Sequence, residues 1–178
     1  MVKPILYLAG KITNNLWRTC FYDVRNEGDI GKHNGINPLE KYVEIKNFKI
    51  NGPYSISCDH SCAHVENTHT MMDTGCIIDG FRRDDILKIC TEQIKNADLL
   101  FCFIDSEDCY GTLAEIGFAK ALNKKIIIQF CNEDIRNNMW FASKMADFSI
   151  YGKSPINEDV LYDFYLMIKK GELNGISV

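Results

Sequence analysis

Apolar residues fall along this chain in short blocks whose spacing alternates between that of a strand and that of a helix. Almost wholly apolar runs at residues 4–9, Leu99–Ile104 and Lys125–Phe130 are typical of strands that are buried on both faces of a sheet. Apolar residues at helical spacing predict helices between and after these runs, at residues 14–25, 81–97, 112–122, 137–145 and 156–170. Strands that alternate with helices predict a parallel sheet.

The stretch between the first two apolar runs has a weaker pattern. Residues 26–38 read as a polar loop, residues 42–50 alternate roughly between apolar and charged positions, and residues 54–57 predict a further strand. We therefore expect one α/β domain over residues 1–178, with an irregular insert at about residues 51–80. The expected fold is flavodoxin-like or Rossmann-like, a parallel, doubly wound sheet of about five strands flanked by helices.

The composition fits one globular domain and excludes several classes of partner. With 178 residues, of which 46% are hydrophobic and 25% charged, the chain can bury one adequate core. A net charge of −4 gives no basic field for a long nucleic acid, although a small nucleoside or nucleotide stays compatible. No run approaches the roughly 20 apolar residues that span a bilayer, and the N-terminus lacks a secretory pattern. We expect a soluble cytoplasmic protein that does not bind a membrane.

The most informative segment joins the apolar run Leu99–Ile104 to the helix that follows it. Residues 105–119 begin with acidic positions and continue at helical spacing, which is the layout of a site at the carboxyl edge of a sheet. Glu115 is expected in the first turn of that helix, where backbone N–H groups and the helix dipole favour an ionised carboxylate. Such a carboxylate can attack an electrophilic carbon. The alternative is a capping box, in which Thr112 and Glu115 only satisfy backbone donors.

Three motifs carry a resemblance to a known family: Tyr7-Leu-Ala-Gly10, Asn96-Ala-Asp98 and Gly111-Thr-Leu-Ala-Glu115-Ile-Gly117. Over about residues 5–142 the chain resembles the nucleoside 2-deoxyribosyltransferases, together with the related nucleoside 5′-monophosphate N-glycosidases. The resemblance implies that Glu115 is the nucleophile and that Tyr7 orients it. It also places Gly10, Gly111 and Thr112 against the substrate, and we expect no cofactor.

The activity that this resemblance implies is cleavage of the N-glycosidic bond of a deoxynucleoside. Glu115 attacks the anomeric carbon to give a glycosyl-enzyme, and a second base then accepts the deoxyribosyl group. Hydrolysis of a nucleoside 5′-monophosphate is one alternative, and a non-catalytic nucleotide sensor, in which Glu115 only caps its helix, is another. In a parallel sheet the loops after the first and central strands meet, so we expect convergence of Tyr7, Gly10, Asp105, Asp108 and Glu115.

Departure of the base is helped by a proton donor. Asp105, Glu107 and Asp108 form an acidic group whose mutual repulsion is expected to raise the pKa of one member, and Asp108 is the candidate acid. A solvated turn is the alternative. The family places aspartates at two positions that align with Cys90 and Cys109 here, so base handling departs from the family pattern.

A second cluster lies where the first strand meets its helix. Lys11, Thr13 and Arg18 lie beside a glycine-bearing loop, and backbone N–H groups and cations at such a junction bind phosphate. Relatives that hydrolyse nucleoside 5′-monophosphates hold phosphate at this position. The alternative is a solvated Lys11 and an Arg18 on an exposed helix face, because the chain has no G-x-G-x-x-G or Walker pattern.

Cysteine and histidine alternate at Cys58, His60, Cys62 and His64. An extended segment would put these zinc-binding side chains on one face, yet such neighbours lie too far apart to close a tetrahedron without a turn. A lid in which His60 or His64 touches the substrate, a subunit contact and simple packing are the other interpretations. Single cysteines elsewhere are expected to be reduced and to serve packing: Cys20, Cys76, Cys90 and Cys131.

The segment Asn137-Asn-Met139 bears on assembly. The family lends an Asn-x-Met segment to the active site of a neighbouring subunit, and Trp140 and Phe141 add more apolar surface than a small monomer usually exposes. We therefore expect at least a homodimer, in which Asn137 or Met139 reaches the sugar site of the partner. Alternatively, Trp140 and Phe141 belong to the protein's own core.

Overall fold

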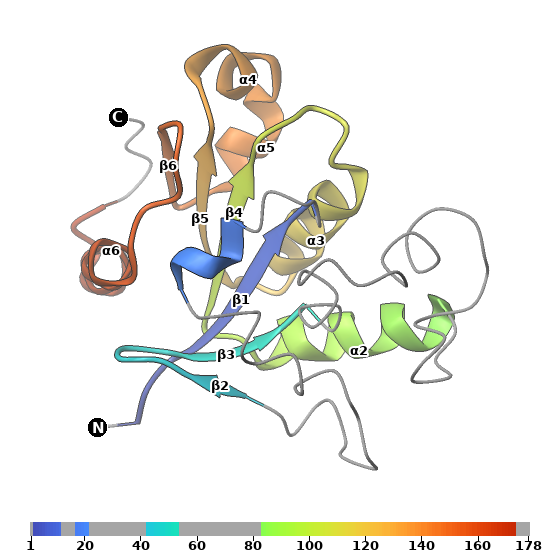
Figure 1. The fold of residues 1–178 in the computed structure, drawn as a ribbon, viewed down its shortest axis with the longest axis vertical. Helices are drawn as coiled ribbons and strands as arrows, with labels where there is room; N and C mark the ends of the chain where they lie inside the picture. The colour runs from blue at the N-terminus through green and yellow to red at the C-terminus, as the bar shows by residue number, and fades with distance from the viewer. Residues whose placement is uncertain (1, 12–16, 22–41, 54–82, 174–178) are drawn as a thin grey trace.

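The computed structural model describes residues 2–11, 17–21, 42–53 and 83–173, which form a sheet flanked by helices (Figure 1). The strands are β1 (Ile5–Gly10), β2 (Val43–Glu44), β3 (Lys49–Gly52), β4 (Leu99–Ile104), β5 (Lys125–Phe130) and β6 (Phe148–Tyr151). The helices are the 3-10 helix η1 (Trp17–Cys20), α2 (Arg83–Asn96), α3 (Tyr110–Ala121), α4 (Glu133–Asn138), α5 (Trp140–Met145) and α6 (Glu158–Lys170). The α/β class is therefore as expected. Among the described residues, no helix is long and apolar enough to cross a membrane.

The sheet has six strands in the order β2-β3-β1-β4-β5-β6, and only the pair of β2 and β3 is antiparallel. In the register of the central strand, Leu100 lies beside Tyr7 of β1 and Ile126 of β5. Every residue of β4 is buried, which explains why this run is wholly apolar. The parallel neighbours β4 and β5, joined through α3, form the β-α-β unit that the sequence predicts.

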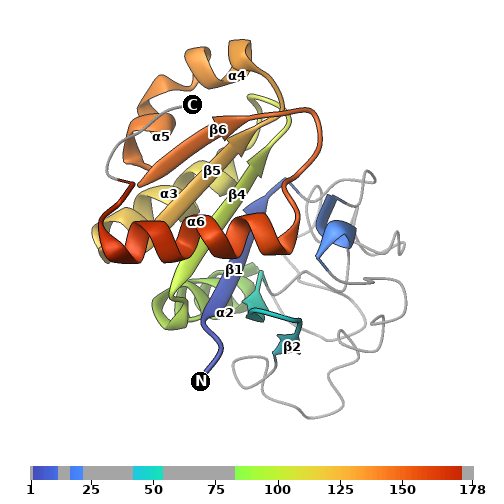
Figure 2. The same ribbon diagram turned by 90° about the vertical axis from the view of Figure 1, so that its left-hand side faces the viewer.

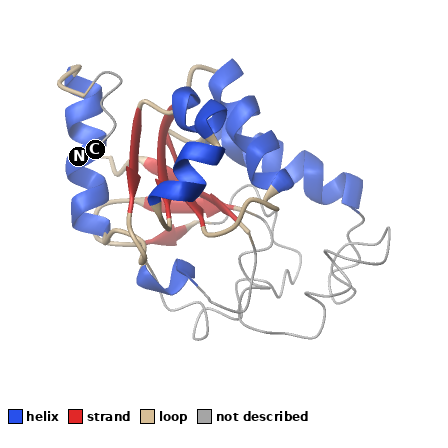
Figure 3. Cartoon of the chain, turned by 90° about the horizontal axis from the view of Figure 1, so that it is seen from above, coloured by secondary structure: helices blue, strands red, loops and turns tan. Residues whose placement is uncertain are grey.

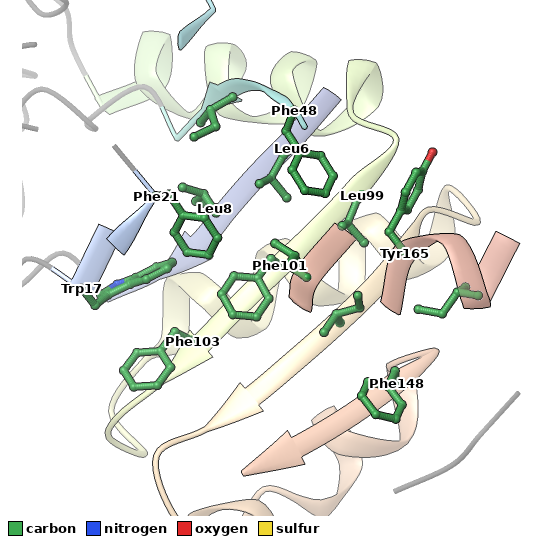
Figure 4. Close-up of a cluster of buried hydrophobic side chains, with 14 of the residues drawn as sticks. Leu6, Leu8, Trp17, Phe21, Phe48, Leu99, Phe101, Phe103, Phe148 and Tyr165 are labelled. Carbon is green, nitrogen blue, oxygen red and sulfur yellow. The ribbon is translucent and has the colours of Figure 1, made fainter. Parts of the chain in front are cut away.

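Helices cover both faces of the sheet, and the alternation of side chains along β1 divides the core into two clusters. Figure 2 shows α6 across one face with α2 and α3 behind the strands, and in Figure 3 the strands lie between helices on both sides. Leu6 packs on the α6 face with Trp17 and Phe101 (Figure 4). Tyr7 lies on the opposite face, in a cluster with Ile116 of α3. The side chain of Tyr7 therefore faces α2 and α3.

Two predicted elements are each divided into two in the structure. The strand expected at residues 42–50 is a hairpin, since its turn is closed by the Ile45 N–H, which donates to the Phe48 carbonyl at 3.0 Å. Within that turn, Lys46 and Asn47 bind Asp159 at the start of α6. The helix expected at residues 137–145 is two short helices, α4 and α5, which meet at Met139.

The other helices and strands can be compared with their predicted bounds. The helices α2 and α6 lie within the predicted ranges, and β4 and β5 have the predicted bounds. Strand β6 was not predicted, because an edge strand of four residues carries too short an apolar pattern. Of the helix expected at residues 14–25, the structure describes η1 and Phe21. The loop at residues 26–38, the strand at residues 54–57 and residues 54–80 of the insert lie outside the described residues.

Candidate active site

The centre of the site is a hydrogen bond between the middle of β1 and helix α3. The Tyr7 hydroxyl donates to Glu115 Oε1 at 2.5 Å, and the Tyr7 side chain is fully buried. The two residues lie far apart in the sequence, and the packing of α3 on the sheet brings them together. We call Tyr7 and Glu115 the buried pair. The expected approach of Tyr7 and Glu115 is confirmed.

The start of α3 corrects the expectation about the position of Glu115. The helix begins at Tyr110 after Cys109, so Glu115 lies in the second turn and not in the first. The N-terminus of α3 has no side-chain cap, and Thr112 is 3% exposed. The capping box is therefore wrong: Glu115 accepts a hydrogen bond from the Tyr7 hydroxyl, across the site.

Burial makes Glu115 a weak acid. Burial raises the pKa of Glu115 from 4.5 to about 7, while the hydrogen bond from Tyr7 and the positive charge of Arg18 act in the opposite direction. The expectation that the helix dipole keeps this carboxylate ionised is therefore wrong, since the second turn lies beyond the terminal N–H groups. Near neutral pH both protonation states of Glu115 are populated, which is the range in which a group can serve as an acid or as a nucleophile.

Cys90 of α2 completes the surroundings of the Tyr7 hydroxyl. Burial raises the pKa of Tyr7 well above 10, and the neighbouring Cys90 and Glu115 raise it further, each through a hydrogen bond and its negative form. The phenol therefore stays protonated and acts as a donor to Glu115. The sequence interpretation of Cys90 as an isolated packing residue missed this contact. A signal was present, because Cys90 stands where the resembling family has an aspartate.

Arg18 is buried beside the end of β1 and does not lie on an exposed helix face. Its side chain is fully buried, and Nη2 donates to the carbonyls of Leu8 at 3.1 Å and Gly10 at 2.9 Å. The guanidinium also lies over the Trp17 ring, 4.4 Å from its centroid. The alternative of a solvated Arg18 is therefore wrong. Its positive charge lowers the pKa of Glu115, so Arg18 acts on the buried pair electrostatically.

Lys11 and Asp108 form an ion pair at the surface of the site, which we call the rim pair. Lys11 Nζ donates to Asp108 Oδ2 at 2.6 Å, with 37% and 59% of the two side chains exposed. This hydrogen bond holds the pKa of Asp108 below its usual value and raises the pKa of Lys11, to which Asp105 also contributes. The expected rise in the pKa of Asp108 through carboxylate repulsion is therefore wrong, because a cation from the β1 loop offsets that repulsion.

The glycines of the two loops differ in what their backbone requires. Gly10 has φ +156°, and a Cβ there would lie 2.8 Å from Trp17 Cζ2 and 2.9 Å from the Phe103 carbonyl oxygen. Only glycine fits this turn of the chain into the site. Gly111 is exposed, and no other side chain or backbone comes within 4 Å of its Cβ position, so its packing does not require glycine.

The Asn137-Asn-Met139 segment lies at the junction of α4 and α5. Asn137 is exposed, while Met139 packs against the cluster on the α2 and α3 face of its own sheet. Trp140 and Phe141 are 62% and 61% exposed, with their rings in edge-to-face contact. Their assignment to the protein's own core is therefore wrong. The exposed aromatic surface that motivated a homodimer is present.

The cysteine and histidine segment lies outside the described residues. Zinc binding, a lid, a subunit contact and packing therefore all stay open for Cys58, His60, Cys62 and His64. Within the described ranges, no group of three or more potential metal ligands occurs. Cys102 and Cys109 are buried free thiols, as the reduced state predicts.

Comparison with known proteins gives no assignment. No protein-family model matches the chain, and no curated protein matches it. A functional conclusion therefore depends on the three motifs and on the geometry of the buried pair.

Proposed function

We propose that this protein cleaves the N-glycosidic bond of a deoxynucleoside and transfers the deoxyribosyl group to a second base. The observation that carries the proposal is the buried pair, a tyrosine hydroxyl that donates to a partly protonated glutamate at 2.5 Å. The motifs around Tyr7, Asp98 and Glu115 resemble those of the nucleoside 2-deoxyribosyltransferases. The proposal includes a doubly wound, flavodoxin-like sheet, in keeping with the strand order and the helices on both faces.

In the first step an oxygen of ionised Glu115 forms a bond to the anomeric carbon. The carbon–nitrogen bond to the base breaks, and the base leaves with the electron pair and takes up a proton from solvent. Tyr7 keeps the attacking carboxylate in one orientation through its hydrogen bond. A nitrogen of the second base then forms a bond to the anomeric carbon, the ester bond to Glu115 breaks, and the second base releases one proton to solvent, which restores the free carboxylate.

The surroundings of Glu115 support catalysis over the sensor alternative. A glutamate that only caps α3 would bind backbone donors at the start of the helix, whereas Glu115 binds Tyr7 from β1. Burial is the largest cause of the raised pKa of Glu115, and burying an ionisable carboxyl costs stability. Such costs are typical of catalytic sites.

The two cations bear on the nucleoside 5′-monophosphate alternative. Arg18 donates to backbone carbonyls, and Lys11 is paired with Asp108. A phosphate at this position has to compete with Asp108 for Lys11. These contacts favour an unphosphorylated nucleoside as the substrate. Nucleoside monophosphates are therefore tested beside nucleosides in the experiment that follows.

Trapping of the intermediate tests the proposed function. The protein is incubated with deoxynucleosides or their monophosphates, with and without a second base, and then quenched for mass spectrometry. We expect one deoxyribosyl group on the peptide that carries Glu115, and a new nucleoside when the second base is present. Glu115→Gln forms no adduct, whereas the control Glu172→Gln, at an exposed position after α6, behaves like the parent protein. Base release without an adduct on Glu115 rejects the covalent mechanism.

We further propose a homodimer with shared sites, in which Asn137 reaches the substrate of the partner. The exposed Asn137, Trp140 and Phe141 support this arrangement. Mixing inactive Glu115→Ala subunits with inactive Asn137→Ala subunits then restores activity, because each mixed dimer contains one intact site. No recovery of activity, or a monomer in sedimentation at working concentration, rejects the shared site.

A further inference from the structure

Two aspartates join the amino ends of neighbouring strands in the same way. The Asp98 N–H donates to the Ile5 carbonyl at 2.8 Å, and Asp98 Oδ2 accepts from the Ile5 N–H at 2.8 Å. The Asp147 N–H donates to the Ile126 carbonyl at 2.9 Å, and Asp147 Oδ2 accepts from the Ile126 N–H at 2.8 Å. We call each of these two-bond contacts an aspartate clamp.

Both clamps come from the same local sequence. Helix α2 ends at Asn96 and helix α5 ends at Met145, and in each case an alanine and an aspartate follow before the next strand begins. The carboxylate accepts from an N–H of the neighbouring strand just before its own strand starts, so it replaces a backbone carbonyl there. This contact gives the aspartate of the Asn96-Ala-Asp98 motif a physical task within the sheet.

The clamp of Asp98 lies close to Tyr7, because it binds β1 two residues before Tyr7, about 7 Å along the strand. On its β4 side, β1 pairs in unbroken register over Leu6–Gly10, whereas on its β3 side the register shifts between Leu6 and Tyr7. The place of Tyr7 therefore depends on β4, the strand that leads into α3 and Glu115. A slip of one residue between β1 and β4 would turn Tyr7 to the other face of the sheet.

We propose that Asp98 is a positioning residue for the reaction, which holds β1 in register on β4 so that the Tyr7 hydroxyl meets Glu115. Asp98 acts through the Ile5 backbone and has no need to touch the substrate. The inference rests on the proposed function, in which Tyr7 and Glu115 are the reactive pair. A merely structural Asp98 would contribute to stability alone, as we expect of Asp147, whose clamp holds a strand that carries neither of these residues.

The two clamps give a matched pair of variants. Asp98→Ala and Asp147→Ala each remove one acceptor, and we expect them to lower the melting temperature by similar amounts. Asp147 also lies 3.6 Å from Lys125 Nζ, but a partly exposed ion pair of this kind contributes little. Only Asp98→Ala is expected to lower kcat, about fivefold, with KM changed less than about twofold. The acidic limb of its pH–rate profile is expected to move to higher pH, because Glu115 loses part of the hydrogen bond from Tyr7.

A conservative variant separates the lost acceptor from a general disturbance of the sheet. The amide oxygen of Asp98→Asn can accept the same bond from Ile5, so we expect this variant to keep kcat within about twofold of the parent value. Asp98→Ser, which shortens the side chain, replaces Asp98→Ala in these measurements if Asp98→Ala does not fold.

Carboxyl titration by NMR tests the same contact without turnover. The pKa of Glu115 is expected to rise in Asp98→Ala and to stay at the parent value in Asp147→Ala, because only the first change weakens the hydrogen bond from Tyr7. That bond is already absent in a Tyr7→Phe background. Adding Asp98→Ala there is expected to move the pKa of Glu115 by less than about 0.2 unit.

Three outcomes overturn the inference. The first is an equal loss of kcat in Asp98→Ala and Asp147→Ala, and the second is a folded Asp98→Ala protein with the parent pH–rate profile and the parent pKa of Glu115. The third is an effect of Asp98→Ala on that pKa that persists in full in the Tyr7→Phe background. Failure of the proposed function is separate, because the parent protein then releases no base while the titration still measures the pKa of Glu115 in each variant.

Discussion

The buried pair and the rim pair place two carboxyl groups of one loop and helix in opposite electrostatic surroundings. Glu115 is half-buried and burial raises its pKa to about 7, whereas Asp108 is exposed and has its pKa lowered by Lys11. The local sequence suggested the reverse, with an ionised Glu115 at a helix start and a protonated Asp108 among other acids. The difference teaches that burial dominates the pKa of Glu115 and that a cation from a distant segment dominates the pKa of Asp108, to which a hydrogen bond from neighbouring Ser106 adds.

The largest expected difference between the two pairs is in activity. Glu115→Ala removes the nucleophile and is expected to lower the rate of base release at least about a thousandfold. Asp108→Asn removes a carboxylate of the rim and is expected to lower that rate less than about tenfold, because solvent protonates the departing base. Chromatography of the released base gives both rates, and circular dichroism checks folding. A similar loss in both variants would show that the rim carboxylate takes part in the chemistry.

The buried pair also predicts a dependence of stability on pH. The pKa of Glu115 is about 7 in the folded protein and 4.5 ordinarily, so the folded state binds the proton more tightly. Its contribution is fully present below pH 4.5 and is lost as the pH rises to about 7. The shift corresponds to at most about 3 kcal/mol of unfolding free energy. Urea unfolding across this range measures the loss.

Glu115→Gln provides the matched comparison for that titration, because glutamine has a similar shape and does not ionise. We expect its unfolding free energy to fall less than that of the parent protein between pH 4.5 and pH 7. Equal pH dependence in the two proteins would place the titrating group elsewhere.

The contrast between the two pairs also separates what the sequence predicts from what it does not. Strands β4 and β5 were predicted to the residue because strands buried on both faces are continuous apolar runs. The approach of Tyr7 and Glu115 was expected from strand order and from the family motifs. The start of α3 was predicted two residues late, since Cys109 before it is not a typical capping residue.

The remaining features of the site depend on contacts between distant segments. Lys11 meets Asp108 only because the loops after β1 and β4 lie side by side. Cys90 reaches Tyr7 through the packing of α2, and the buried Arg18 of η1 binds carbonyls at the end of β1. Single-sequence periodicity shows which face of an element is apolar, but it does not show which polar side chains meet across the sheet.

Removing only the hydroxyl of Tyr7 tests the internal bond of the buried pair. Tyr7→Phe loses the hydrogen bond that lowers the pKa of Glu115, so that pKa is expected to rise above about 7. At neutral pH we expect kcat to fall about tenfold, with the acidic limb of the pH–rate profile moved to higher pH. The matched control is Tyr162→Phe on α6, whose ring packs on Phe48 at the other face of the sheet. An unchanged pH profile would remove Tyr7 from the control of Glu115.

The smallest effect is expected at the rim pair. Lys11→Met removes the cation that holds the pKa of Asp108 down, so a carboxyl titration by NMR is expected to show that pKa moving upward. Base release is expected to change less than about threefold, because an exposed ion pair contributes little. Lys46→Met is the matched control, since Lys46 pairs in the same way with exposed Asp159 at the start of α6 and lowers its pKa. A tenfold or larger loss of activity on nucleoside monophosphates alone, in Lys11→Met and not in Lys46→Met, would instead assign Lys11 to phosphate binding and favour the hydrolytic alternative.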